Sequence, residues 1–276
     1  MPKKSAQLID GKALAEEILL DLKNKVSQLD RKPGLAVILI GNDSASLVYV
    51  KNKKRAAEKT GIIFHDYLCD NEFYPNITEK EILDMIDFLN NDSTIDGIII
   101  QLPIPKKFDT EKIIERIDPK KDVDGFHPKN KSIVSPLIQA VLKSLAATKE
   151  NLAGKTALIV AKNPVFSEPL KKNLEQVGLK VKMVEPTDKN LERQTKTADV
   201  LLVILGQKHF IKKSMIKPEA IVIDIGTNLI DKNKWVGDVE AKAAEVASFL
   251  TPVPGGIGPL TVAYLLKNTF EAANKK

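Results

Sequence analysis

The sequence predicts an α/β protein with two three-layer domains, each built around a mostly parallel sheet. Short apolar runs of strand length alternate with amphipathic stretches of helical length, first before residue 101 and again after residue 155. This alternation is typical of parallel sheets that helices cover on both faces. The length of 276 residues suits two domains of ordinary size.

The first half of the chain predicts three helices that alternate with three strands. Aliphatic residues at helical spacing predict the first helix, and the capping residues Asn42 and Asp43 precede the second. Thr78 and Glu81 have the spacing of a capping box at the third. In chain order the predicted elements are a helix over 12–29, a strand over 34–40, a helix over 44–60, a strand over 62–68, a helix over 78–89 and a strand over 97–101.

The same alternation starts again in the second half of the chain. A predicted helix over 136–148 marks the break between the two halves, and a Pro/Gly-rich loop over 251–259 precedes the closing helix. Buried strands read as short, nearly continuous apolar runs. The predicted elements are a strand over 155–161, a helix over 168–176, strands over 179–184, 200–205 and 220–225, and a closing helix over 260–273.

Charge and cysteine content narrow the function classes. Lys and Arg number 42 and Asp and Glu number 36, so the formal net charge is 42 − 36 = +6, without the clustered patch of a nucleic-acid binder. Cys69 is the one cysteine, which leaves no intrachain disulfide or cysteine-based zinc site and favours a reducing compartment. The sequence has neither a signal-peptide core nor an apolar run near the ~20 residues that span a bilayer. We therefore expect a cytoplasmic protein with no nucleic-acid or membrane partner.

Tyr49 and Lys53, on the predicted helix 44–60, are candidates for proton transfer. They are four residues apart, so they share one face of the helix. A buried lysine at a cleft has a lowered pKa and can move protons near neutral pH. The alternative is that residues 51–55 form a solvated basic face, and spacing alone does not decide between the two. For the three histidines, which occur in no hydrolase or metalloprotease motif, a structural role is favoured.

Three further segments carry polar groups or unusual backbone. Gln101 ends a predicted strand, where ligands of parallel sheets collect; its alternative role is a hydrogen bond within the loop. Asp122 and Asp124 precede Gly125, and either offers a binding carboxylate or forms a turn. The loop over 251–259 holds three prolines and three glycines in nine residues, which predicts a close approach of its backbone to another group.

Six motifs, in this order, resemble those of the FolD family, the methylenetetrahydrofolate dehydrogenase/methenyltetrahydrofolate cyclohydrolases. The motifs are Tyr49-Val50-x-x-Lys53-x-x-Ala56, Gln101-Leu102-Pro103-Ile104-Pro105, Lys121-Asp122-Val123-Asp124-Gly125-Phe126, Ile223-Asp224-Ile225-Gly226-x-Asn228, Val236-Gly237-Asp238-Val239 and Thr251-Pro252-Val253-Pro254-Gly255-Gly256-Ile257-Gly258-Pro259-Leu260-Thr261. The similarity extends from residue 8 to the last helix. It implies a folate-binding catalytic domain over 1–144, completed by 257–276, and a Rossmann-like dinucleotide-binding domain over 145–256, with a cleft between them.

The resemblance also implies roles for residues of the folate site. The family's essential lysine falls on Lys53, which handles the protons as water opens 5,10-methenyltetrahydrofolate to 10-formyltetrahydrofolate. Gln101 orients that lysine and Tyr49 lies against the folate, so these three form the expected catalytic set. Asp124 falls on the family's pterin-binding aspartate, since a carboxylate can accept two hydrogen bonds from the pterin. The residues Pro254, Gly255 and Gly256 are expected to line the same cleft, and no metal is expected.

In the cofactor half, the sequence departs from the family pattern. Ala161 and Ser167 replace the two glycines that let a dinucleotide pyrophosphate approach the backbone. Glu168 is expected in the first turn of the following helix, where it opposes a phosphate. Glu185, after the second strand, is expected to pair with a ribose 2′-hydroxyl and to repel a 2′-phosphate. The expected site for NADP or NAD is therefore eroded; its residues are Ala161, Lys162, Asn163, Ser167, Glu185, Gly206 and Thr227.

Three functions remain open on the sequence. The favoured one is one-carbon folate interconversion, with cyclohydrolase activity and NAD(P)-dependent oxidation of 5,10-methylenetetrahydrofolate. The second is a monofunctional cyclohydrolase with a degenerate dinucleotide site, and the third is a non-catalytic binding protein. By resemblance, the partners are tetrahydrofolate derivatives and a second copy of the chain in a homodimer.

Overall fold

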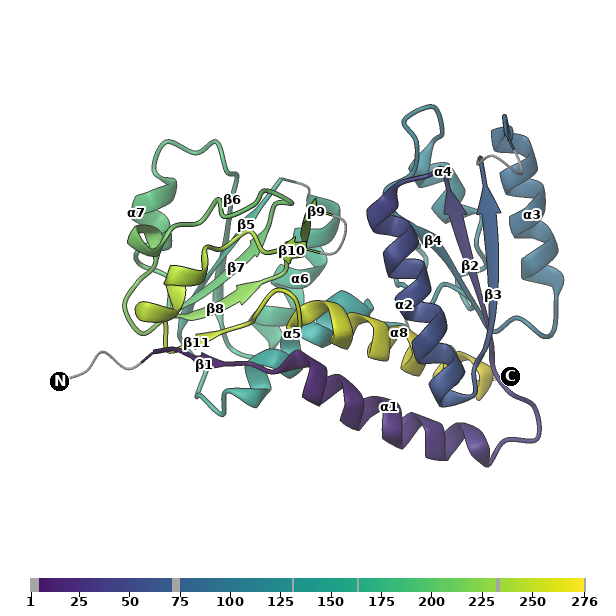
Figure 1. Cartoon of the computed structure of the whole chain (residues 1–276), viewed down its shortest axis with the longest axis horizontal. Coiled ribbons are helices and arrows are strands. Elements are labelled where there is room, and N and C mark those ends of the chain that lie inside the picture. The colour runs from purple at the N-terminus through teal and green to yellow at the C-terminus, as the bar shows by residue number, and fades with distance from the viewer. Residues whose placement is uncertain (1–4, 71–74, 131, 163, 232–233, 276) are drawn as a thin grey trace. The chain divides into compact units, whose positions relative to one another are not determined.

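The computed structural model describes residues 5–70, 75–130, 132–162, 164–231 and 234–275, which group into two compact units (Figure 1). The three-stranded unit comprises residues 15–136 and 261–276, and the six-stranded unit comprises residues 1–14 and 137–260. Each unit has a parallel sheet with helices packed on it. The predicted fold class, α/β with two mostly parallel sheets, is therefore confirmed.

The sheet of the three-stranded unit has the strand order β3-β2-β4, with all strands parallel. β2 (Gly34–Ile40) is buried along its whole length because it is the central strand. Its odd-numbered aliphatic residues face a core shared with α1 (Gly11–Ser27), α2 (Ser44–Thr60) and α8 (Ile257–Ala273). Its even-numbered residues from 36 on face a core shared with α3 (Glu79–Asn91) and α4 (Thr110–Glu115). Helices thus cover both faces, and Figure 1 shows α2 and α3 on opposite sides of β2, β3 (Ile63–Cys69) and β4 (Gly97–Gln101).

Local signals at the helix ends fix α2 and α3. The Asp43 carboxylate accepts hydrogen bonds from the backbone N–H and the hydroxyl of Ser46, both at 2.7 Å, which caps α2. Gly61 ends α2 in the left-handed conformation, with φ of 80°. At α3 the predicted capping box is present, because Thr78 and Glu81 bond each other's backbone N–H groups. The N-caps fix where α2 and α3 begin. The start of α2 in turn decides which of its residues lie on the partly buried face.

The six-stranded sheet has the strand order β1-β11-β8-β7-β5-β6, again all parallel. From β5 the chain moves outward to β6 and then returns to β7 on the other side of β5, so the strand order reverses between β5 and β7. Ligands of open α/β sheets bind at such a switch point, beyond the carboxyl ends of the strands. The bounds are β1 (Gln7–Leu8), β5 (Thr156–Ala161), β6 (Lys180–Val184), β7 (Val200–Ile204), β8 (Ile221–Asp224) and β11 (Phe249–Leu250).

Short elements complete the six-stranded unit. Its α-helices are α5 (Pro136–Ala147), α6 (Pro164–Gln176) and α7 (Leu191–Thr195), its 3₁₀ helices are η1 (Lys213–Met215) and η2 (Ala241–Glu245), and an antiparallel pair joins β9 (Asn228–Asp231) and β10 (Lys234–Val236). Apolar residues of β5, β7 and β8 form one core with α7 and the two 3₁₀ helices. At the amino edge of this sheet the Asp199 carboxylate accepts hydrogen bonds from the backbone N–H and the hydroxyl of Thr156, at 2.8 and 2.9 Å.

The contacts group the chain differently from the domain ranges expected above. β1 pairs with β11, so the N-terminal segment groups with the six-stranded unit, and residues 137–144 of α5 do the same. β1 has two residues, too few for a pattern in the sequence to show. Helices α6 and α8 begin at least three residues earlier than predicted: α6 at Pro164 instead of Glu168, and α8 at Ile257 instead of Leu260. For α6 the proline supplies the reason, because it is well suited to the first position of a helix.

Candidate active site

Helix α2 and the end of β4 bring Lys53 and Gln101 together. The ammonium Nζ of Lys53 donates a hydrogen bond of 2.7 Å to Oε1 of Gln101. The amide Nε2 of Gln101 in turn donates to the Leu102 carbonyl at 2.7 Å, so the orientation of this amide is fixed. Gln101 is buried at the carboxyl end of the sheet, and Tyr49 lies one turn before Lys53 on α2. The hydrogen bond that the resemblance implies between the lysine and the glutamine is therefore present.

The surroundings of Lys53 differ from those of the basic residues next to it. Lys51 and Arg55 are exposed, and Lys54 forms a surface ion pair with Asp66 at 3.1 Å. Lys53 is partly buried, and this burial lowers the pKa of its ammonium group, against the opposing effect of the Asp124 carboxylate. The interpretation of residues 51–55 as one uniformly solvated face is therefore wrong for Lys53.

Asp124 is the second titratable group of this site. Burial raises its pKa to about 6; the Lys53 charge opposes that rise and the Asp122 charge adds to it. Each of the two groups thus has its pKa moved toward neutrality by burial and influences the other through space. Such a pairing of perturbed groups is typical of a catalytic or binding site.

Asp122 holds the loop that carries Asp124. Its Oδ1 accepts from the backbone N–H of Gly125 at 3.0 Å, and its Oδ2 accepts from the backbone N–H of His127 at 2.8 Å and from Nδ2 of Asn130 at 3.0 Å. Asn268 of α8 ties the same loop down by donating to the carbonyls of Val123 and Val134 at 2.9 and 3.1 Å. Asp122 is therefore a turn residue, and Asn130 and Asn268 are supporting residues that sequence reasoning missed.

Substitutions of the two aspartates are expected to affect stability differently. Asp122→Asn places an amide N–H₂ group against a backbone N–H on one side or the other, because both carboxylate oxygens are acceptors. We expect the free energy of unfolding at pH 7 to fall by about 1.5–3 kcal/mol, the value of a buried hydrogen bond to a charged group. Asp124→Asn removes a charge that burial disfavours, so stability should stay equal or rise. Urea unfolding at pH 7 measures both; a larger loss for Asp124→Asn would contradict the assignment.

The predicted cofactor residues lie at the carboxyl edge of the six-stranded sheet. Cα pairing joins Val160 to Val184, so Ala161 at the end of β5 and Glu185 after β6 are the next residues along neighbouring strands. Lys162 and Glu185 are exposed, Gly206 follows β7 by two residues, and Thr227 follows β8 by three. Asn163 lies outside the described residues. Lys162 and Gly206 thus follow the two strands of the switch point, and Glu185 follows the strand on the outer side of β5. A cation, a carboxylate and a bare glycine at this edge are chemically compatible with a dinucleotide.

Gly206 shows why a close approach at this edge is possible. Its φ is +62°, and a Cβ added there would meet nothing within 4 Å, so the space beside its Cα is open. A left-handed φ with a bare Cα lets another group contact the backbone directly. Among the described residues no group of three or more His, Cys, Asp or Glu is placed to hold a metal ion.

Two family models match consecutive parts of the chain. Residues 9–124 match the tetrahydrofolate dehydrogenase/cyclohydrolase catalytic domain, and residues 136–276 match the NAD(P)-binding domain of the same family. The chain belongs to this family. The bifunctional protein FolD of Ruthia magnifica subsp. Calyptogena magnifica is 42% identical over 98% of this chain and 99% of its own length.

Solved structures of the tetrahydrofolate dehydrogenase/cyclohydrolase family share the fold along the whole chain. The bifunctional FolD of Campylobacter jejuni is 36% identical with a TM-score of 0.91, over 98% of this chain and 99% of that one. The Trypanosoma brucei enzyme, solved with NADP cofactor and an inhibitor, is 29% identical with a TM-score of 0.91, over 100% of this chain and 99% of that one.

The expected position of Glu168, in the first turn of the helix after β5, is wrong. Because α6 begins at Pro164, Glu168 is the fifth residue of the helix and is exposed, so it does not lie in the first turn. A charge beyond the first turn has little effect on an anion at the helix start. Ser167 is buried within α6. The replacement of the two glycines by Ala161 and Ser167 stands, and its effect on binding remains a prediction.

The Pro/Gly loop is anchored within the six-stranded unit. The backbone N–H of Lys12 donates to the Gly255 carbonyl at 2.9 Å, and a Cβ added at Gly11 would lie 1.9 Å from the Gly256 carbonyl oxygen. The close approach that the loop composition predicts is therefore made to the start of α1. Pro254 is exposed, and the place of Pro254, Gly255 and Gly256 in the folate site stays a prediction.

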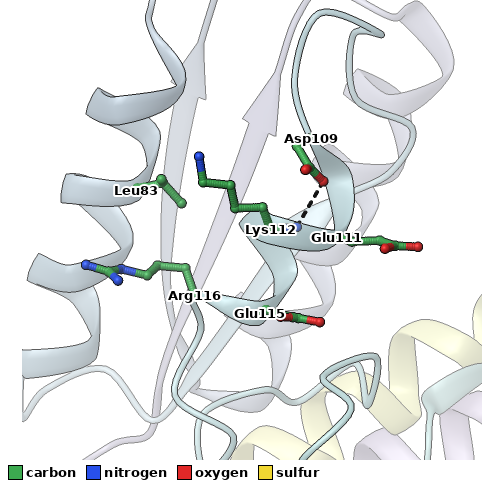
Figure 2. A pocket seen from close by; sticks show the side chains of 6 residues that line it. All are labelled: Leu83, Asp109, Glu111, Lys112, Glu115 and Arg116. Atoms are coloured by element: carbon green, nitrogen blue, oxygen red, sulfur yellow. Dashed lines mark hydrogen bonds between the residues drawn. The ribbon is translucent and has the colours of Figure 1, made fainter.

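A surface pocket between α3 and α4 lies on the other side of the three-stranded sheet from Lys53. Figure 2 shows Lys112 and Arg116 turned toward the helix that carries Leu83, with Glu111 and Glu115 turned away. Both cations have acidic partners: Lys112 pairs with Glu79 at 2.6 Å, and Arg116 pairs with Asp87. Asp109 caps α4 by accepting from the Lys112 backbone N–H at 3.1 Å. Asp109, Lys112 and Arg116 thus stabilise the helices, whereas the two mutually interacting, partly buried groups at Lys53 and Asp124 mark that site as the candidate active site.

Proposed function

We propose that this chain catalyses two consecutive steps of one-carbon folate interconversion. It hydrolyses 5,10-methenyltetrahydrofolate to 10-formyltetrahydrofolate, and it oxidises 5,10-methylenetetrahydrofolate to the methenyl form with NADP. The Lys53–Gln101 hydrogen bond beside Asp124 is the observation that carries the proposal. Matches to both domains of the family, and the bifunctional relatives, support both steps.

Lys53 is the group that moves protons in the hydrolysis. The carbon between N5 and N10 of the methenyl substrate is amidinium-like and already electrophilic, so the reaction needs a positioned base more than a metal. Burial lowers the pKa of Lys53, which makes its neutral amine available to take a proton from the attacking water. The resulting ammonium can then protonate N5 as the C–N5 bond breaks, and the hydroxyl group on the carbon loses its proton to water as the carbonyl of the N10-formyl group forms.

Gln101, Tyr49 and Asp124 place the reactants around Lys53. Gln101 accepts a hydrogen bond from Nζ and has its own amide held by the Leu102 carbonyl, so it directs the amine. We assign Tyr49, on the same helix face, to contact with the folate. Asp124 accepts the hydrogen bonds of the pterin 2-amino group and a ring N–H, a charge-assisted pair of contacts.

NADP, when bound, supplies the hydride acceptor for the oxidation. We assign Lys162 to contact with a phosphate, Glu185 to contact with a ribose hydroxyl, and Gly206 to a direct approach of the nucleotide to the backbone. All three follow strands at the carboxyl edge of the six-stranded sheet. The NADP complex of the Trypanosoma brucei relative and the match to the NAD(P)-binding domain support NADP as the cofactor.

A paired assay on the purified protein tests the proposal. One arm follows hydrolysis of methenyltetrahydrofolate, and the other follows oxidation of methylenetetrahydrofolate with NADP and with NAD separately. We expect turnover in both arms. Hydrolysis without use of either nucleotide would instead establish the monofunctional cyclohydrolase, which the match to the NAD(P)-binding domain disfavours. Absence of both activities, with folate binding intact, would support a non-catalytic binding protein.

Glu185 is expected to weaken NADP binding relative to NAD. Its carboxylate follows β6 and is exposed at the same edge as Lys162, where an acidic side chain repels a 2′-phosphate. Glu185→Gln should therefore improve NADP affinity several-fold and leave NAD affinity equal or lower. Calorimetric titration with each nucleotide measures the effect, and Glu175→Gln, an exposed position on α6, is the matched control. Tight NADP binding by the unmodified chain, unchanged in Glu185→Gln, would show that Glu185 does not contribute.

We further infer that the chain acts in the cytoplasm as a homodimer. The single cysteine supports a reducing compartment, and burial raises the pKa of its thiol to about 11, which keeps it unreactive. As a separate observation, none of the helices within the described residues combines the length and the hydropathy of a membrane span. The dimer rests on the family resemblance, and sedimentation equilibrium of the purified protein tests it.

A further inference from the structure

Two buried aspartates, Asp224 and Asp238, lie at the carboxyl edge of the six-stranded sheet. Asp224 is the last residue of β8, and Asp238 follows β10 by two residues. Their exposed fractions are 3% and 0%. Both belong to motifs that carry the family resemblance, and neither has a role in the function proposed above. A buried carboxylate needs partners, so the contacts of the two show what they do.

The Asp238 carboxylate holds the loop that follows β7. Its Oδ2 accepts from the backbone N–H groups of Leu205 at 2.6 Å and Gly206 at 3.0 Å, and its Oδ1 accepts from that of Gln207 at 2.7 Å. Three successive N–H groups directed at one anion form a nest, the arrangement that elsewhere binds phosphate. Nδ2 of Asn228 donates a fourth hydrogen bond to Oδ1 at 3.0 Å. The nest is thus filled from within the protein, and the loop keeps the conformation in which Gly206 has a φ of +62°.

Asp224 in turn fixes the backbone at Asp238. Its Oδ1 accepts from the backbone N–H of Asp238 at 3.1 Å, and its Oδ2 accepts from that of Val239 at 2.9 Å. The two aspartates also pack against each other's glycines. A Cβ added at Gly226 would lie 2.0 Å from the Asp238 carboxyl carbon, and one added at Gly237 would lie 1.8 Å from Asp224 Oδ2. Only glycine fits either place, so the backbone and both carboxylates are fixed together.

Burial of the charged Asp224 carboxylate lowers the stability of the fold. Burial raises the pKa of Asp224 to about 7 and the nearby Asp238 charge adds to the rise, while backbone N–H groups oppose it. Burying carboxylates adds little net stability, and such groups are retained in some proteins because they specify one conformation. Here the conformation that they specify is that of the Leu205–Gln207 loop.

The loop lies where a dinucleotide is expected to bind. It follows β7, which with β5 forms the switch point of the sheet. Because Asp238 already accepts from the N–H groups of all three loop residues, the loop presents the bare Cα of Gly206 to a ligand and few free donors. We propose that Asp238 is a positioning residue for the nicotinamide dinucleotide: it fixes the Leu205–Gln207 loop so that Gly206 packs against the nucleotide. This inference rests on the proposed NADP-dependent oxidation.

Calorimetric titration with NADP tests the role of Asp238. In Asp238→Asn one carboxylate oxygen is replaced by an amide N–H₂, which cannot accept hydrogen bonds. The loop therefore loses about half of the hydrogen bonds that hold it. We expect the NADP dissociation constant to rise on the order of tenfold, which corresponds to a loss of about 1.4 kcal/mol of binding free energy. The KM for NADP should rise with it, whereas the KM for the folate substrate should not. Asn228→Ala removes one of the four hydrogen bonds and should weaken NADP binding less, in the same direction.

Asp199→Asn is the matched control. That carboxylate is held by two hydrogen bonds from Thr156 and an ion pair with Lys217, at the amino edge of the same sheet. It should lower the melting temperature without changing NADP affinity. If Asp238→Asn fails to fold, Asn228→Ala carries the test. Wild-type NADP affinity in the folded Asp238 and Asn228 variants would overturn the inference, whereas absence of NADP binding by the unmodified chain would overturn the proposed oxidation itself.

Discussion

Lys53→Ala is expected to abolish hydrolysis of methenyltetrahydrofolate while folate analogues still bind. Loss of a positioned base reduces turnover on the order of 10²–10⁴-fold, and within the described residues Lys53 is the amine that Gln101 holds. The initial rate of methenyltetrahydrofolate loss, corrected for the uncatalysed reaction, measures the effect. Calorimetry with a folate analogue shows whether the site remains formed.

Lys54→Ala is the matched control for Lys53→Ala. It removes the same charge one residue later, from a side chain that pairs with Asp66 on the surface, and should leave turnover near that of the unmodified chain. Lys53→Arg separates base from charge, because a guanidinium stays protonated and so cannot accept the proton. An active Lys53→Ala protein would contradict the assignment, and an active Lys53→Arg protein would show that the charge alone suffices.

Asp124 also sets the pH dependence of this hydrolysis. Only neutral Lys53 can act as base, so turnover should rise with pH as the ammonium loses its proton. The Asp124 carboxylate raises the pKa of Lys53 against the effect of burial. Removing that carboxylate in Asp124→Asn should therefore move the rising limb of the pH–rate profile to lower pH.

Asp124→Ala should weaken folate binding by about 1.5–3 kcal/mol, the value of hydrogen bonds to a charged group. That loss corresponds to roughly 10- to 150-fold in the dissociation constant of a folate analogue. The carboxylate must be ionised to accept two hydrogen bonds, and its pKa is raised to about 6. Affinity of the unmodified chain should therefore fall as the pH drops below about 6, and Asp124→Asn should lack this dependence.

Calorimetric titrations with a folate analogue between pH 5 and 8 measure both the loss of affinity in Asp124→Ala and the pH dependence of affinity in the unmodified chain. Asp30→Asn, at an exposed position of the same unit, controls for the loss of one negative charge. Equal affinity of Asp124→Ala and the unmodified chain would exclude a pterin contact at this residue.

Local signals in the sequence were sufficient for the parts of the fold that lead to the site. The strands over 34–40 and 97–101 and the helix over 44–60 have the predicted bounds, because continuous apolar runs and a capping aspartate define them. The shared helix face of Tyr49 and Lys53 follows from their spacing alone. The contacts that distinguish Lys53 from Lys51, Lys54 and Arg55 do not, since they come from Gln101 at the end of β4 and from the charge of Asp124.

The features that the sequence did not predict depend on contacts between distant segments. Asn268 supports the Asp124 loop from a helix more than 130 residues later, and Asp238 reaches back 31–33 residues to the loop after β7. Single polar residues of this kind have no periodicity that marks them. The early start of α6 was missed because its first residues lack a helical apolar pattern, although Pro164 was a signal for it. The two-residue strands β1 and β11 are defined by pairing with neighbouring strands, β11 with β8 and β1 with β11.

Product stoichiometry in one reaction tests most directly whether the chain catalyses both the oxidation and the hydrolysis. The protein is incubated with 5,10-methylenetetrahydrofolate and excess NADP, and NADPH, methenyltetrahydrofolate and 10-formyltetrahydrofolate are quantified over time, with Lys53→Ala in parallel to give the uncatalysed hydrolysis. Each oxidation yields one NADPH and one methenyl group, and each hydrolysis consumes one water and releases one proton. We expect NADPH and 10-formyltetrahydrofolate in equal amounts, with 10-formyltetrahydrofolate formed well above the rate of hydrolysis seen with Lys53→Ala. Accumulation of methenyltetrahydrofolate at the rate seen with Lys53→Ala, or the absence of NADPH, would contradict it.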